Sequence, residues 1–246
     1  MGKTTCFNLI ILDESGSMSD LTPETISGCN ETLNIIRELD KKHGDTQRQL
    51  VSIFVFQSGN PNSPSRYICK NTSIKDVEDI TEKDYRPYGC TPLLDAVGST
   101  LVDLRAVAST HEDAVASVTI ITDGYENSST DYTWEQVANL INQLKELGWN
   151  FNFIGANIDV EAVSRKMNIP NSMSFKASSQ GMASMMGTLS DCLASYHEDR
   201  IKEESTLSRE DRIAYRKKLA SSFFHPDSSR HKDRRKDRRK DENEPY

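Results

Sequence analysis

Apolar residues along the chain fall into short, nearly continuous runs that alternate with longer segments whose apolar residues recur three or four positions apart. Short apolar runs are typical of buried β-strands, and the longer spacing is typical of helices with one buried face. This alternation predicts an α/β fold with a doubly wound, mostly parallel central sheet and helices on both faces. Strands are expected at residues 7–12, 50–56, 66–70, 115–122, 151–154 and 174–176, and the run 66–70 is expected as one short antiparallel edge strand.

Helices are expected between these strands. Thr22 before Pro23 is typical of a helix start, and Gly44 is typical of a helix end, so the first helix is predicted between them with Thr22 as its cap. Further helices are expected at 93–104, 134–147, 159–167, 181–196 and 208–221. Because residues 7–12 are apolar at nearly every position, their strand is expected in the centre of the sheet.

The composition of the chain changes near residue 198. Residues 1–198 are predicted to form one α/β domain, and residues 199–225 a charged helical extension. Residues 226–246 are predicted to be a disordered tail, because the stretch 230–240 is basic and acidic throughout and has no apolar side chain to bury.

Composition and charge narrow the function classes. A net charge of −7 argues against a protein that binds nucleic acid over its whole surface. The five cysteines are scattered without a C-x-x-C pair, so neither a zinc site nor a disulfide framework is predicted, and a reducing compartment is favoured. The apolar run near the start is too short for a signal peptide or a membrane span. A cytoplasmic protein is therefore expected.

Three polar segments lie where strands end or helices begin. Asp13, Ser15 and Ser17 follow the first strand, Thr91 precedes a helix, and Asp123 follows the strand at 115–122. Because the carboxyl ends of parallel strands meet at one edge of a sheet, we expect these side chains to converge. Carboxylate and hydroxyl oxygens suit a hard cation, so the sequence predicts a site for Mg²⁺ or Mn²⁺. With three neutral ligands the ion keeps much of its charge, which favours capture of a carboxylate from a protein partner.

The same residues resemble a known family. Asp13, Ser15 and Ser17 match its D-x-S-x-S pattern, and Thr91 and Asp123 match its distant threonine and aspartate. The family is the von Willebrand factor A (vWA), or integrin I-like, domain with a metal-ion-dependent adhesion site (MIDAS), and the resemblance covers residues 5–197. It implies a Rossmann-like vWA fold, a metal ligand role for these five residues, and a partner Glu or Asp that completes the metal shell. Residues 89–96 and 153–157 look similar to segments of compact intracellular microbial members.

Two other functions compete with a metal-dependent interaction module. Asp13 after a buried strand also resembles the nucleophile of a Mg-dependent phosphohydrolase of the haloacid-dehalogenase type, but that chemistry needs an acid where Ser15 stands, so an enzyme is not expected. The basic residues of 230–240 could bind nucleic acid through the tail alone.

Three further acids near the predicted site, Glu14, Asp20 and Glu126, are expected to be solvated loop residues.

Overall fold

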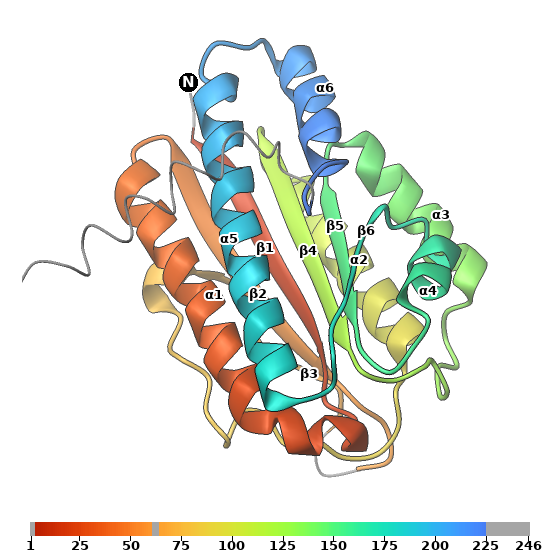
Figure 1. The fold of residues 1–246 in the computed structure, drawn as a ribbon. Coiled ribbons are helices and arrows are strands. Elements are labelled where there is room, and N and C mark those ends of the chain that lie inside the picture. The colour runs from red at the N-terminus through yellow and green to blue at the C-terminus, as the bar shows by residue number, and fades with distance from the viewer. Residues whose placement is uncertain (1–2, 61–63, 225–246) are drawn as a thin grey trace, which may run out of the picture.

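The computed structural model describes residues 3–60 and 64–224. It contains a six-stranded sheet in the order β3-β2-β1-β4-β5-β6, with helices on both faces (Figure 1). Every neighbouring pair is parallel except β2 and β3, which are antiparallel. The predicted fold class is therefore confirmed. The strands are β1 (Thr4–Asp13), β2 (Gln47–Phe56), β3 (Arg66–Ser73), β4 (Ala114–Thr122), β5 (Asn150–Gly155) and β6 (Asn171–Ser174).

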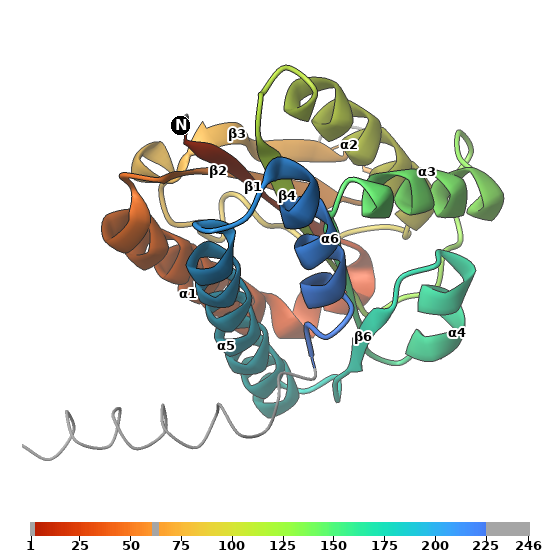
Figure 2. The same cartoon turned by 90° about the horizontal axis from the view of Figure 1, so that it is seen from above.

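The helices form two layers, which Figure 2 shows from above. One layer consists of α1 (Thr22–His43), α5 (Ser179–Glu204) and α6 (Arg209–Ala220); the other consists of α2 (Leu93–Ala108), α3 (Trp134–Glu146) and α4 (Val160–Lys166). Two short 3₁₀ turns, η1 (Gly16–Leu21) and η2 (Ile74–Asp76), complete the described elements. The sheet therefore has a separate hydrophobic core on each face.

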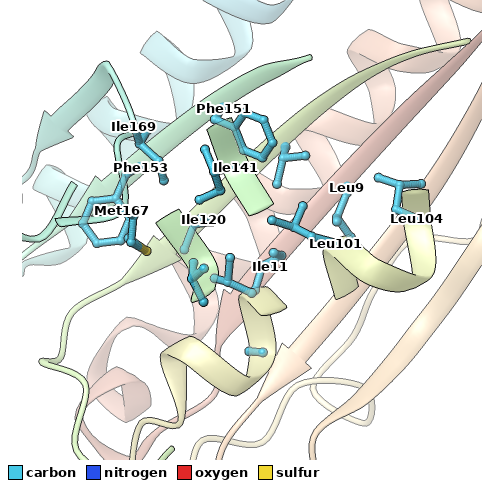
Figure 3. Packing of buried hydrophobic residues seen from close by; sticks show 14 of the residues in the cluster. Leu9, Ile11, Leu101, Leu104, Ile120, Ile141, Phe151, Phe153, Met167 and Ile169 are labelled. Atoms are coloured by element: carbon cyan, nitrogen blue, oxygen red, sulfur yellow. The ribbon is translucent and has the colours of Figure 1, made fainter. Parts of the chain in front are cut away.

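Strand β1 lies in the centre of the sheet, as its sequence predicts. All ten of its residues are buried, because alternate side chains enter opposite cores. Leu9 and Ile11 pack with Leu101 of α2 and neighbouring residues in the core shown in Figure 3, whereas Ile10 and Leu12 pack on the face covered by α1 and α5. This double burial makes β1 a rigid support for the loop that follows it.

Some boundaries differ from the predictions. Helix α1 is preceded directly by η1, so its cap position is Leu21, and Thr22 instead donates its hydroxyl to the Ser19 carbonyl oxygen at 2.9 Å. The last strand lies at 171–174 rather than at 174–176. The Asn171 side chain holds it there by donating to Asn150 Oδ1 of β5 at 3.1 Å.

Helix α5 extends past the predicted end at residue 196 to Glu204, because its last turns carry buried charged side chains. Arg200 is fully buried and donates to Glu204 at 3.0 Å. Glu204 also accepts a hydrogen bond from Nε of Arg216 in α6 at 2.5 Å, and Arg216 donates another to Asp113 at 3.0 Å. This cluster, which we call the α5–α6 ion network, fastens α6 to the amino edge of the sheet.

The predicted division at residue 198 falls inside α5, and the predicted tail, residues 226–246, lies outside the described residues. The domain division thus stays a prediction. Within residues 3–60 and 64–224, no helix combines the length and the apolarity that a bilayer-spanning helix needs.

Candidate metal centre

The predicted site lies at the carboxyl edge of the sheet, at the bottom of Figure 1. β1 and β4 run in parallel register with Leu12 beside Ile121, so the two strands end side by side. Asp13, the last residue of β1, accepts the Thr122 hydroxyl of β4 at 2.5 Å. The loops that follow β1 and β4, which carry Asp13 and Asp123, therefore start side by side.

Hydrogen bonds connect the first and third predicted loops. The Ser15 backbone N–H donates to Asp13 Oδ1 at 2.7 Å, and the Ser17 hydroxyl donates to Asp123 Oδ1 at 2.6 Å. The two serine hydroxyl oxygens lie 3.2 Å apart. Asp13, Ser15 and Asp123 are buried, whereas Ser17 is exposed. The site is consequently open to solvent at one side.

The second loop is joined to the other two by its backbone. Gly16 N–H donates to the Gly89 carbonyl oxygen at 3.1 Å, and Thr91 exchanges two hydrogen bonds with Asn127, at 2.9 and 3.2 Å. A Cβ placed on Gly124 would lie 2.9 Å from Thr91 Oγ1 and 3.8 Å from Asp13 Oδ2. The Thr91 hydroxyl and the Asp13 carboxylate thus face one small space, and the structure brings all five predicted residues to one place.

Gly89 is required by the close approach of two loops. Its φ is +75°, and a Cβ at this position would overlap the carbonyl oxygen of Ser58. Ser58 and Cys90 exchange two backbone hydrogen bonds, at 2.8 and 3.0 Å, while the Cys90 side chain is exposed. These bonds fix the backbone one residue before Thr91.

The electrostatics of the site favour a cation. Burial raises the pKa of Asp13 to about 6 and also raises the pKa of Asp123, and the nearby Asp123 charge adds to the rise at Asp13. In the described part of the chain neither carboxylate forms an ion pair with a basic side chain. Two buried carboxylates without a positive counter-charge are costly, and a divalent ion between them would offset that cost.

The donor set fits a hard cation rather than a soft one. Among residues 3–60 and 64–224 no three His, Cys, Asp or Glu side chains gather in a metal-holding group. A cation here would be held by two carboxylates and three hydroxyls, with water or a partner in the remaining positions. Neutral oxygens would supply most of the protein ligands.

A neighbouring acid has a structural role that the sequence analysis missed. Glu14 was expected to be solvated, and this prediction is wrong, because its side chain is fully buried. It accepts Arg66 Nη1 at 2.7 Å and the Arg86 backbone N–H at 2.6 Å. The ion pair ties the loop after β1 to the edge strand β3. Glu14 and Arg66 lie far apart in the sequence, so no local pattern indicates the contact.

Glu126 is also more than a solvated acid. It is half-buried, and its carboxylate accepts backbone N–H groups of Leu94, Ser128 and Ser129 at 2.7 to 2.9 Å. It therefore joins the loop after Asp123 to the start of α2. The acid followed at two and three positions by serines is a local signal that could have indicated a turn cap. The third acid, Asp20, is exposed as expected.

Sequence comparisons give no relatives, but structural comparisons do. No family model matches the chain, and no curated protein matches it by sequence. The fold is similar to the pilus adhesin SpaC from Lactobacillus rhamnosus GG in its open conformation, with TM-score 0.55 and 13% identity over 79% of this chain and 30% of SpaC. It is similar to the PilB minor pilin from Streptococcus sanguinis, with TM-score 0.52 and 12% identity over 79% of this chain and 62% of PilB.

A third similar structure is proximal thread matrix protein 1 from the mussel byssus, with TM-score 0.53 and 15% identity over 78% of this chain and 47% of that protein. This chain spans less than two thirds of each of the three proteins. At such low identity the likeness shows the fold alone. Together with the strand order and the single antiparallel edge strand, it supports the Rossmann-like vWA fold that the sequence resemblance implies.

Proposed function

We propose that the chain is a divalent-metal-dependent protein–protein interaction module. In this proposal Mg²⁺, or Mn²⁺, is held in a MIDAS-type site by Asp13, Ser15, Ser17, Thr91 and Asp123, and it binds a Glu or Asp of a protein partner. The supporting observation is the meeting of two buried carboxylates, without an ion pair among the described residues, with three hydroxyl-bearing residues at the open edge of the sheet.

The ligand set explains why a partner carboxylate is the proposed target. Two carboxylates balance the formal charge of a divalent ion. Each of them, however, also accepts a hydrogen bond from a hydroxyl group: Thr122 donates to Asp13, and Ser17 donates to Asp123. The protein's own residues hold these carboxylates in place before any metal arrives. A divalent ion bound there supplies strong attraction for a further oxygen ligand, and an acidic side chain is the strongest such ligand in a protein.

We propose binding rather than catalysis at this site. A phosphohydrolase with Asp13 as nucleophile needs a general acid nearby, yet Ser15 holds that position and its backbone N–H binds Asp13 itself. The adjacent acid, Glu14, is paired with Arg66. A screen of phosphoesters should show no Mg²⁺-dependent turnover above an Asp13→Asn control; turnover that this substitution abolishes would show an enzyme instead.

Titration calorimetry with Mg²⁺, and electron paramagnetic resonance with Mn²⁺, test the metal site directly. Asp13→Asn keeps the side-chain shape but removes one of two charged ligands, so we expect affinity to fall by at least about tenfold. The matched control is Asp20→Asn, an exposed acid in the same segment, which should bind metal as the unchanged chain does. Equal metal affinity in the two variants would refute the site.

The proposed location is the cytoplasm, as the scattered cysteines of the sequence indicate. The pilus proteins named above share the fold, and no location follows from that likeness. Any contact with nucleic acid is assigned only to residues 230–240, which lie outside the described residues.

A further inference from the structure

An open groove of about 610 Å³ lies beside the candidate metal site. It runs between the end of β2, the start of α2 and the segment 128–132. Pro92, the residue after Thr91, lines it, and so does Ser58, which pairs with Cys90. A partner segment that reaches the metal next to Thr91 therefore passes close to this groove.

The walls of the groove are held in fixed positions. The Ser58 hydroxyl donates to the Ser128 hydroxyl at 2.9 Å, which joins the end of β2 to the 128–132 segment. Asp95, in the first turn of α2, accepts the backbone N–H groups of Thr130, Asp131 and Tyr132 at 2.8 to 2.9 Å. These bonds make the groove a preformed feature rather than a gap between loose loops.

The chemistry of the groove combines apolar surface with negative charge. Phe54, Pro92 and Tyr132 give it an apolar floor, and Asp95 and Asp131 each contribute a carboxylate. No basic side chain lies among the described residues that line it. The Asp131 side chain is exposed, and among the described residues its carboxylate accepts one hydrogen bond, from the Thr130 hydroxyl at 3.2 Å. It therefore has lone pairs free for a further donor.

We propose that this groove binds the side chain of an Arg or Lys from the same partner segment whose acidic residue binds the metal. The inference rests on the proposed function and adds a second recognition element to it. The apolar floor fits the methylene stem of a long basic side chain, and the carboxylates fit its cationic head. A second acidic residue in place of the basic one would be repelled by Asp95 and Asp131, so the groove selects segments of mixed charge.

A displayed library of random peptides tests this with the full chain immobilised in Mg²⁺ and bound peptides released by EDTA. We expect released peptides to be enriched in an acidic residue together with a nearby Arg or Lys. On Asp131→Lys the preference for the basic residue should disappear while the acidic residue remains. The matched control is Asp45→Lys, at an exposed acid just before β2 on the opposite edge of the sheet, which should keep the original preference.

A second measurement isolates the basic side chain. Replacing the Arg of a selected peptide with citrulline keeps its shape and removes its charge, so affinity should fall about fivefold at low ionic strength, and the difference should shrink as salt is added. A melting curve of each variant confirms that it folds.

The outcomes separate the two proposals. The groove proposal is wrong if peptides released by EDTA carry an acidic residue but show no preference for a basic one. It is also wrong if the basic preference survives Asp131→Lys. Neither result contradicts the metal-dependent interaction module. If EDTA releases no acidic peptides above the background of Asp13→Asn, the proposed function itself fails, and the groove inference fails with it.

Discussion

The Thr91 hydroxyl lies beside Gly124, a residue without a side chain. Gly124 follows Asp123 and leaves the space into which Thr91 Oγ1 and Asp13 Oδ2 face. A methyl group there would lie 2.9 Å from Thr91 Oγ1, closer than ordinary side-chain contacts allow. Gly124 carries no ligand atom, but it leaves the space that Thr91 and Asp13 share.

We expect Gly124→Ala to weaken Mg²⁺ binding by about tenfold while leaving the fold intact, because the new methyl group displaces one hydroxyl ligand by a fraction of an ångström. Calorimetry measures the affinity. The matched control is Gly187→Ala in α5, where the new Cβ meets nothing within 4 Å; it should leave metal affinity unchanged and stabilise the helix by about 0.5–1 kcal/mol. Unchanged affinity in Gly124→Ala would show that Thr91 does not hold the metal.

At the same scale, the sequence identified the five candidate ligands but not their supports. Each candidate follows a strand or precedes a helix within a short recognisable pattern, so position along the chain predicted position in space. The Glu14–Arg66 ion pair and the bonds between Thr91 and Asn127 join segments that are remote in sequence. Such contacts depend on how loops fold over one another, which local patterns do not encode.

Among the elements, α6 is held by buried charged side chains in addition to the apolar contacts of Leu219 and Ala220. Arg200 and Arg216 are nearly inaccessible to solvent, and both donate to the single carboxylate of Glu204. Buried guanidinium groups are tolerated only when a counter-charge and hydrogen bonds satisfy them. Loss of one member of the α5–α6 ion network would therefore leave a buried charge without its partner.

We expect Glu204→Gln to destabilise the protein by about 3–5 kcal/mol, because two buried positive charges lose their shared partner. Urea denaturation measures the free energy of unfolding. The matched control is Glu38→Gln, which breaks an exposed pair with Lys41 and should cost less than about 0.5 kcal/mol. Similar losses in both variants would mean that the network does not hold α6 in solution.

This network also explains why the sequence missed the end of α5. Strands β1 to β5 and most helices were predictable because their apolar spacing matches the geometry of each element. The last turns of α5 look solvent-facing in sequence, since they carry Arg200 and Glu204, yet both side chains are buried. Arg200 donates to Gln47 of β2, and Glu204 accepts a hydrogen bond from Arg216 of α6. A charged residue whose partner lies on another element gives no periodic signal, so the helix was predicted to end at residue 196.

For the molecule as a whole, His197 links stability to pH. It is buried between α5 and β1, with Nε2 3.2 Å from Asn8 Oδ1, and burial together with the nearby Arg200 charge lowers its pKa to about 3. In the unfolded chain a histidine takes up a proton near pH 6.5, whereas the folded chain keeps it neutral. Stability is therefore full above that pH and is lost as the pH falls toward 3.

Between pH 7.5 and pH 5.5 we expect this histidine to lower the free energy of unfolding by about 1.4 kcal/mol. His197→Gln retains an N–H donor for Asn8 and does not titrate, so it should show a correspondingly smaller loss over the same interval. Urea denaturation at both pH values gives the comparison. The same loss in the variant and in the unchanged chain would assign the acid sensitivity to other groups.

The exposed thiol of Cys90 has a practical consequence. It lies one residue from Thr91, on a backbone fastened to Ser58, whereas Cys6, Cys29 and Cys192 are buried and Cys69 is half-buried. A maleimide fluorophore should consequently attach first at Cys90. The natural chain thus carries its own attachment point for a dye that would report occupancy of the adjacent edge by a change in emission, without any engineered residue.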